Sequence, residues 1–280
     1  MNLTHFHQMG KELYDKLHLP TYPVAITYIK TEDEIPAKAM RPSAAGQKMC
    51  ICQAFTYARS WGAQVAITAE DNFCVPSSAG HKWVDVTDEE FIQSQVTQGW
   101  HKSRAAEEKR IGLYNSLFAG PGGDTALAKA RSRMGLVCAP LHNAVLEPDT
   151  ILVFGNGVHI THIIHALCYD YTVPIFSFFE GFGESCLKGG LLPFITGRPQ
   201  IVIPGMGDRA FAGITPDEIG VGMPAAFLPE VMENLFKTGG VMNIGMPFKT
   251  MMPTNLTENI TPGFAWLKKV ANAKRRQASE

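Results

Sequence analysis

The sequence predicts an α/β fold in which two similar βαβ half-domains share one core, with a helical insertion between them. The main observation is a pattern that occurs twice: a β-prone run, a helical run, a second β-prone run and then a lone cysteine. A mostly helical stretch, 87–134, separates the two copies. We therefore expect a first half over 1–134, which contains the insertion, and a second half over 135–280, which ends in a helix and a tail.

The first half begins with a helix over 3–18, where apolar residues recur at helical spacing. The first copy of the pattern then has β-prone runs at 24–29 and 64–69, with a helical run at 53–62 between them. It ends at Cys74 in a polar loop.

The second half contains the second copy of the pattern, which ends at Cys186 in a glycine-containing loop. Its predicted elements are, in order, strands over 135–141 and 150–155, a helix over 159–171, strands over 174–181 and 198–205, and a helix over 228–240. If both copies fold alike, Cys74 and Cys186 occupy equivalent loops at strand ends, where α/β folds bind ligands. We therefore expect the two cysteines to lie close enough to share one ligand.

The composition favours a packed globular protein that binds neither nucleic acid nor membranes. The 280 residues are 45% hydrophobic and 18% charged, and the formal net charge of −1 creates no field that attracts DNA, RNA or an anionic membrane. The N-terminus lacks the pattern of a signal peptide, and no apolar stretch is long enough for a transmembrane helix. We expect a cytoplasmic protein with a small-molecule ligand, whose six cysteines are reduced thiols, metal ligands or catalytic groups and not a disulfide framework. A homo-oligomer is left open.

Cys50 and Cys52 precede a helix in a C-x-C pattern, which is the spacing of neither a zinc ribbon nor a thioredoxin motif. The N-terminus of a helix lowers the pKa of a thiol and favours the thiolate, which binds soft metals. In an extended C-x-C the two side chains point to opposite faces, so we expect one of the pair to face a site and the other to be buried. Cys138 and Cys168 have apolar neighbours and are expected in the core.

Three histidines form a second group of candidate ligands. His159, His162 and His165 recur every three residues and share one broad face of the predicted helix. Imidazoles bind zinc, copper and haem iron, but a metal site needs further ligands. The alternative is a polar helix face or a subunit contact.

A glycine-rich segment, PGMGDRAFAG, follows the strand predicted at 198–205. The backbone N–H groups of Gly205 and Gly207 and the guanidinium of Arg209 could bind a phosphate or carboxylate of a cofactor or substrate. The spacing matches neither a Walker loop nor a dinucleotide fingerprint. The alternative is a tight turn in which Asp208 and Arg209 pair with each other. If the segment binds a ligand, Arg209 faces the same cleft as the loop cysteines.

The order of several segments resembles a known family. The chain contains, in sequence over roughly 20–240, CQAFTYARSWG, AEDNFC, LVCAPL, EPDTILVFGN, HALCYDYTVP, ESC and PGMGDRAFAGITPDEIGVGMP. This order is similar to that of the domain of unknown function 169 (DUF169). The resemblance implies Cys52, Cys74 and Cys186 as matching positions, and the frequency of members in anaerobic bacteria and archaea suits an oxygen-sensitive cofactor. The chain departs from the family in Cys50, in its three histidines and in the PGMGDR loop.

The leading hypothesis is an iron–sulfur protein of anaerobic redox or small-molecule metabolism, with its cluster held between the two halves. A four-iron cluster is held by four thiolates. Cys52, Cys74 and Cys186 would supply three of these, with Cys50 or a non-protein ligand as the fourth. Such a protein could be an oxidoreductase or a lyase. The alternatives are a module that binds haem or another cofactor through a helix histidine, and a metal-free regulatory or partner protein.

Overall fold

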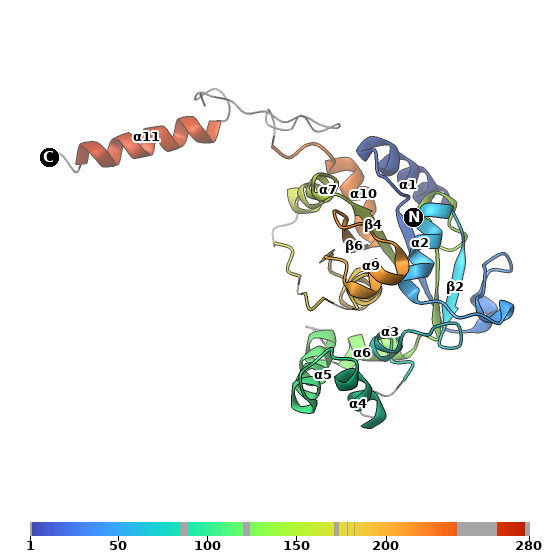
Figure 1. Ribbon diagram of the computed structural model, residues 1–280. Helices are drawn as coiled ribbons and strands as arrows, with labels where there is room; N and C mark the ends of the chain where they lie inside the picture. The colour runs from blue at the N-terminus through green and yellow to red at the C-terminus, as the bar shows by residue number, and fades with distance from the viewer. Residues whose placement is uncertain are drawn as a thin grey trace.

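The computed structural model describes residues 2–84, 89–119, 124–170, 174–177, 179–181, 183–239 and 262–277. These residues form a mixed α/β fold around one six-stranded sheet (Figure 1). The strands are β1 (Val24–Ile29), β2 (Val65–Thr68), β3 (Gly135–Pro140), β4 (Thr150–Gly155), β5 (Gln200–Val202) and β6 (Ile219–Pro224). They lie in the order β2-β3-β1-β4-β6-β5, and each neighbouring pair is antiparallel.

The strand order places the first strand of each copy of the repeated pattern at the centre of the sheet. β1 pairs with β4 there, with Val24 opposite Leu152. On one side of this pair β3 lies next and β2 lies at the edge, and on the other side β6 lies next and β5 lies at the edge. The strands of the first predicted βαβ unit are therefore not adjacent, because β3 separates β1 from β2. The similarity of the two halves in three dimensions, and their division after residue 134, stay predictions.

One predicted strand is absent from the second half. The described residues of the run 174–181 have no regular secondary structure. Phe176 is 75% exposed, so the apolar residues of this run do not mark a buried strand. The strand at the edge is β5, which begins 19 residues further along at Gln200. The repeat predicted Cys186 in a loop at the end of a strand. In the structure Cys186 lies in a π-helix instead.

Helices cover both faces of the sheet (Figure 1). The described α- and π-helices are α1 (Leu3–Leu17), α2 (Ile51–Trp61), α3 (Val75–Gly80), α4 (Glu89–Thr97), α5 (Arg104–Ala119), α6 (Asp124–Arg131), α7 (Gly157–Asp170), the π-helix η5 (Glu184–Leu191), α8 (Leu192–Thr196), α9 (Met206–Ala212), α10 (Leu228–Asn234) and α11 (Pro262–Gln277). Side chains alternate along a strand. Ala25 of β1 therefore packs on the side of α1, α7 and α10, while Val24 and Ile26 pack on the side of α2, η5 and α8.

The predicted insertion, 87–134, contains α4, α5 and α6. Phe91 and Ile92 of α4 form a small core with Ala79 of α3, and α6 reaches the main core. No described helix is both long and apolar enough to cross a membrane. The tail predicted from residue 241 lies outside the described residues as far as α11.

The π-helix η5 packs closely on β6 and on α3, and each of these two elements has a glycine at the contact. A Cβ atom added to Gly222 of β6 would lie 2.0 Å from the carbonyl oxygen of Gly189 in η5. A Cβ atom added to Gly80 of α3 would lie 2.4 Å from Leu187 of the same π-helix. Both contacts are shorter than real Cβ atoms make, so the position of η5, and with it that of Cys186, depends on these glycines.

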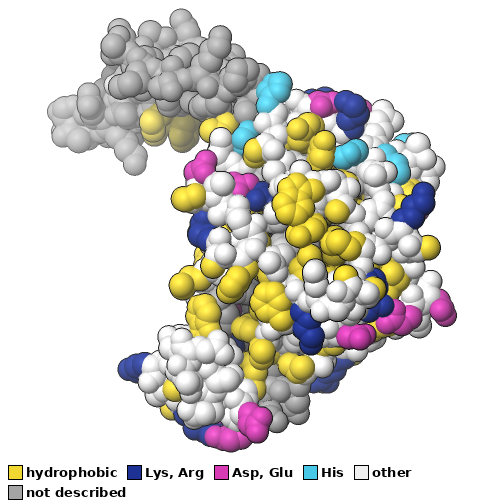
Figure 2. All heavy atoms as spheres, turned by 45° about the vertical axis from the view of Figure 1, so that its right-hand side comes forward, with side chains coloured by type: hydrophobic (Ala, Val, Ile, Leu, Met, Phe, Trp, Pro, Cys, Tyr) yellow, Lys and Arg dark blue, Asp and Glu magenta, His cyan; other side chains and the backbone are white. Residues whose placement is uncertain are grey.

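Hydrophobic side chains occupy much of the middle of the face shown in Figure 2, and charged side chains lie mostly toward its edges. Among the described residues, the large exposed hydrophobic side chains include Trp61, Phe73, Met206 and Phe211. Single exposed apolar side chains are normal in soluble proteins, but neighbouring ones can mark a binding site.

Candidate functional site

Four of the six cysteines line one pocket with a volume of about 280 Å³. These four, Cys50, Cys52, Cys74 and Cys186, are called the pocket cysteines below. They come from three segments that are far apart in the sequence. All four were singled out from the sequence as metal ligands, and the fold brings them together. The remaining two, Cys138 in β3 and Cys168 in α7, do not line this pocket.

Each pocket cysteine lies at the start of a helix. Cys50 is the N-cap of α2, and Cys52 follows in the first turn of the same helix. Cys74 is the N-cap of α3, and Cys186 is the third residue of η5. The C-x-C segment is therefore not extended, so the expectation that its side chains face opposite ways is wrong: both thiols reach the pocket. π-helices are rare and are often found at functional sites.

Cys50 has a structural role as well as a place in the pocket. Its Sγ atom accepts a hydrogen bond from the backbone N–H of Gln53 at 3.4 Å. The backbone N–H of Cys50 in turn donates to Oε1 of Gln53 at 3.0 Å. This reciprocal arrangement is a capping box with sulfur in place of the usual hydroxyl. It fixes the entry of the chain into α2 and holds the Cys50 side chain at the pocket.

A buried amide holds Cys74 in place. Oδ1 of Asn72 accepts from the backbone N–H of Cys74 at 3.2 Å, and Nδ2 donates to the carbonyl oxygen of Cys74 at 3.0 Å. The same Nδ2 group donates to the hydroxyls of Ser77 and Ser78 in α3. Asn72 is thus the residue that gives the polar loop before α3 its shape.

The neighbouring Asp71 joins the loop before α2 to the loop before α3. Its fully buried carboxylate accepts from the hydroxyl of Ser43 at 2.6 Å, from Arg41 at 2.9 Å and from the backbone N–H of Thr68 at 2.9 Å. Its carbonyl oxygen accepts from the N–H of Met49 at 2.8 Å. Burial alone raises the pKa of the Asp71 carboxyl, but these hydrogen bonds outweigh it and lower the pKa to about 2.

The pKa values of all four pocket cysteines are raised above the ordinary value of a thiol. A hydrogen bond with Cys52, followed by burial, raises the pKa of Cys50, and a hydrogen bond with Cys186 has the largest effect in raising that of Cys52. Burial raises the pKa of Cys74. The hydrogen bond with Cys52 lowers the pKa of Cys186, but burial and the neighbouring acidic groups outweigh it. The low pKa expected for Cys50 and Cys52 is therefore wrong.

The pKa values of the pocket thiols are raised because of the groups that surround them. Every ionisable group that lines the pocket is an acid, namely the four thiols and Asp208, and no described lysine, arginine or histidine lines it. Burial and neighbouring negative charge both disfavour a thiolate. A helix N-terminus carries only a partial positive charge, which does not offset these effects. A bound metal cation carries more positive charge than a helix N-terminus and would favour the thiolate over the thiol, because a thiol that coordinates a metal is deprotonated.

A single metal ion does not fit the arrangement as it stands. Among the described residues, no group of three or more His, Cys, Asp or Glu side chains is placed so that it could hold a metal ion. The thiols of Cys52 and Cys186 are instead in hydrogen-bond contact with each other.

The predicted glycine-rich segment forms the start of α9, and only some of its residues line the pocket. Gly207 lines the pocket. Gly205 is the N-cap of α9, and its N–H donates to Oδ2 of Asp208 at 2.9 Å. Arg209 does not line the pocket, and its guanidinium donates to the carbonyl oxygen of Thr215 at 2.5 Å. The alternative pairing of Asp208 with Arg209 is not found among the described hydrogen bonds and ion pairs of either residue.

Sequence reasoning missed Asp208 and the aromatic residues of the pocket. Asp208 is 2% exposed, and its side chain lines the pocket next to the thiols. Phe73, Trp100 and Phe211 form aromatic parts of the wall. The signal for Asp208 was present, because an acid three residues after a glycine N-cap is typical of a helix start. No local signal connects Trp100, which follows α4, with a pocket built mainly from other segments.

The three histidines lie far from this pocket in the architecture. α7, which carries them, packs on the side of the sheet that contacts α1 and α10, while the pocket cysteines belong to the opposite side. His159 accepts a hydrogen bond from the N–H of Asn156 at 3.0 Å, so it shapes the start of α7. The ring of His162 contacts Phe236.

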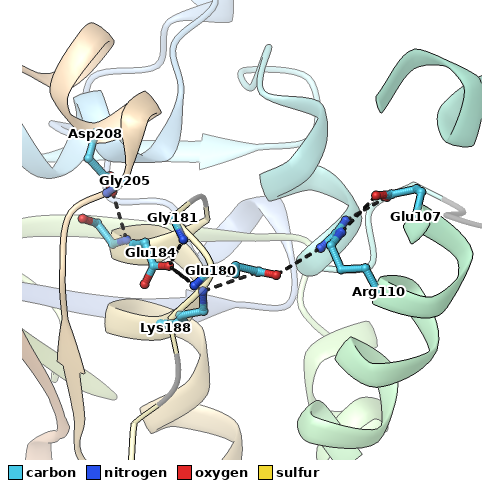
Figure 3. A network of polar contacts seen from close by, with 9 residues as sticks. Glu107, Arg110, Glu180, Gly181, Glu184, Lys188, Gly205 and Asp208 are labelled. Carbon is cyan, nitrogen blue, oxygen red and sulfur yellow. Dashed lines mark hydrogen bonds and ion pairs between the residues drawn. The ribbon is translucent and has the colours of Figure 1, made fainter. Parts of the chain in front are cut away.

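A buried charge network supports the segment that carries Cys186 (Figure 3). Lys188 of η5 is 1% exposed and donates to Glu184 at 2.7 Å and to Glu180 at 3.4 Å. Glu180 also pairs with Arg110 of α5 at 3.8 Å, and Arg110 pairs with Glu107 at 3.0 Å. Oε1 of Glu184 accepts from the N–H groups before η5 as well. The network thus joins the insertion to the π-helix of the site.

Comparison with known proteins places this chain in a family. The model of the DUF169 family, described as uncharacterised ArCR, matches residues 12–234, so the chain belongs to that family. It is also 26% identical over 97 residues to the uncharacterized protein MJ0308 of Methanocaldococcus jannaschii. That match covers 35% of this chain and 42% of the relative, so it spans less than half of the relative's length. No solved structure matches the chain.

Proposed function

We propose that this member of the DUF169 family is an iron–sulfur protein whose pocket cysteines hold a [4Fe–4S] cluster. The observation that supports the proposal is the convergence of four of six cysteines, from three distant segments, on one pocket. Four thiolates is the number that such a cluster uses. Free cysteines are common in protein cores, but packing alone gives no reason for four of them to gather around one cavity.

The absence of a single-ion site among the described residues is compatible with a cluster. In a four-iron cube each thiolate binds a different iron. The cysteine sulfur atoms around a cube therefore lie farther apart than the ligand atoms around a single metal ion. The thiols of Cys52 and Cys186, which now contact each other, would move apart on loading. Ligand thiols are deprotonated when they bind metal, which would also remove the hydrogen bond between them.

The bound cluster would supply one-electron transfer or, with only three thiolates, an open iron that acts as a Lewis acid. The chain's own contribution is the pocket wall. Phe73, Trp100 and Phe211 limit the access of water, and Asp208 places one carboxylate beside the thiols. These features suit an oxidoreductase or a lyase acting on a small molecule, and they leave the reaction itself open.

The two alternatives make different predictions. A haem-binding module would use a histidine of α7, which lies across the sheet from the cysteines, so the pocket gives this alternative no support. A sharp Soret band would nevertheless favour it. A metal-free regulatory protein would be colourless and free of iron after anaerobic purification.

The test is anaerobic purification followed by analysis of iron and sulfide, visible absorbance and electron paramagnetic resonance after reduction. We expect about four irons and four sulfides per chain, as in a [4Fe–4S] protein. Cys74→Ser and Cys186→Ser should lose most of the iron and the colour. Cys168→Ser, which changes a cysteine on the other side of the sheet, should retain both. Equal iron content in these three variants would overturn the proposal.

Cys50→Ser distinguishes the role of Cys50 as the N-cap of α2 from its proposed role as a cluster ligand. Serine is a favoured N-cap residue, so this variant keeps the capping interaction while it removes a thiolate. If Cys50 is the fourth ligand, we expect an unfolding temperature close to that of the wild type and loss of one iron or of the whole cluster. Full iron content in Cys50→Ser would assign the fourth position to a non-protein ligand.

A further inference from the structure

The carboxylate of Asp208 has one oxygen with a structural role and one without. Oδ2 accepts from the N–H of Gly205 at 2.9 Å and from the N–H of Ser185 at 3.4 Å (Figure 3). Oδ1 is buried and accepts no hydrogen bond from any described residue. A buried carboxylate oxygen without a donor is costly and calls for an explanation. Because Asp208 lines the pocket, a ligand there can supply the missing donor.

Part of the pocket wall is aromatic. Phe73, Trp100 and Phe211 all line the pocket, and the rings of Phe73 and Phe211 meet edge to face with centroids 6.0 Å apart. Phe73 is 43% exposed and Phe211 is 60% exposed, so both have surface left for a ligand. Aromatic faces attract cations and also pack against alkyl chains.

The charge of the lining excludes anions from this pocket. Its described ionisable side chains are all acidic, and Arg209, the cation expected there, donates to Thr215 instead. An anionic ligand would meet Asp208 and the sulfurs without a compensating charge. A cluster held by thiolates adds further negative charge, so the preference for a positive or neutral ligand holds in the loaded protein too.

We propose that the pocket binds a small ammonium compound, whose N–H group donates to Oδ1 of Asp208 while its alkyl part lies against the aromatic wall. The ligand would be the molecule brought to the cluster, and in that respect the inference rests on the proposed function. A carboxylate together with aromatic rings is the chemistry that recognises alkylammonium groups. The volume of about 280 Å³ restricts the ligand to a small molecule.

The test compares three ligands with one alkyl chain, butylammonium, 1-butanol and butyrate, by isothermal titration calorimetry on the anaerobically purified protein. We expect butylammonium to bind about tenfold more tightly than 1-butanol, the ratio that separates a charged from a neutral hydrogen bond. Butyrate should show no measurable binding. Equal affinity for all three, or a preference for butyrate, would overturn the inference.

Asp208→Asn should reduce the affinity for butylammonium about tenfold, to that of 1-butanol. Asp217→Asn is the matched control, because Asp217 is an exposed acid outside the pocket, and it should bind butylammonium as the wild type does. If Asp208→Asn fails to fold, the comparison of the three ligands on the wild-type protein still decides. An unchanged affinity in folded Asp208→Asn contradicts the inference.

Iron is measured in the same samples, so the two proposals fail separately. A preference for butylammonium in a protein without iron would contradict the cluster and leave the ammonium site standing. A loaded cluster without that preference would contradict the ammonium site alone.

Discussion

Gly222→Ala tests whether the position of the π-helix η5 depends on its contact with β6. The added Cβ atom would lie 2.0 Å from the carbonyl oxygen of Gly189 and 2.8 Å from its Cα atom. Both are backbone atoms, so the clash cannot be relieved by a side-chain rotation. One of the two elements has to move by about 1 Å to reach the roughly 3 Å separation of real Cβ contacts.

The expected cost follows from these contacts. Overpacking in a well-packed core typically costs about 1–3 kcal/mol, and a clash with backbone belongs at the upper end. Alanine is favoured over glycine in a strand by roughly 0.5–1 kcal/mol. The net loss of stability is therefore about 2 kcal/mol, which lowers the unfolding temperature by roughly 3–4 °C for a chain of 280 residues.

Thermal unfolding followed by circular dichroism measures this loss, and Gly112→Ala is the matched control. Gly112 lies in α5, and a Cβ atom added there meets nothing within 4 Å. The same substitution should therefore stabilise the protein by roughly 0.5–1 kcal/mol. If Gly222→Ala unfolds at or above the wild-type temperature, η5 does not pack on β6 as described.

Three further substitutions test buried polar groups. Asp71 has a pKa of about 2 in the fold, so its contribution to stability is full above its unfolded pKa near 4 and is lost as the pH falls toward 2. Asp71→Asn should therefore cost about 2 kcal/mol at pH 7 and roughly half as much at pH 3 in urea unfolding, and a pH-independent cost contradicts this. Burial lowers the pKa of His81 to about 4, so the wild type should lose up to about 3 kcal/mol as the pH falls from about 6.5 to 4, and His81→Gln should lose less; equal losses in both refute the assignment. Lys188→Met leaves Glu184 buried without its 2.7 Å partner and should cost about 3–5 kcal/mol in thermal unfolding. The double variant with Glu184→Gln should recover part of that loss, and no recovery would mean that the pair does not act as a unit.

The sequence was sufficient for features that depend on local pattern. The runs 24–29 and 150–155 are mostly apolar and β-prone, and both form strands at the predicted positions. The mixed α/β class also follows from such runs alternating with helical ones. Cys74 and Cys186 were identified because each ends one copy of the repeated pattern in a loop, and Cys50 and Cys52 because they directly precede a helix.

The features that the sequence did not predict depend on contacts between distant residues. Strand order is one, because nothing within β1 specifies that β3 and β4 are its neighbours. The π-helix is another, since its geometry depends on the close approach of Gly189 to Gly222. The raised pKa of the Cys52 thiol is a third, because its main cause, Cys186, is far away in sequence. Asp208 became a candidate only when its second oxygen proved to have no donor among the described residues.

The central place of β1 has a consequence for how the chain is made. Ile29 of β1 pairs with Gly135 of β3, and Val24 pairs with Leu152 of β4. A ribosome adds about 5–20 residues per second. The synthesis of β3, the first strand that pairs with β1, is therefore completed roughly 5–25 s after that of β1. During that time its apolar residues and unpaired backbone groups are exposed, which favours aggregation and chaperone binding. The strand that holds the finished sheet together is thus the one with the longest unprotected period during synthesis.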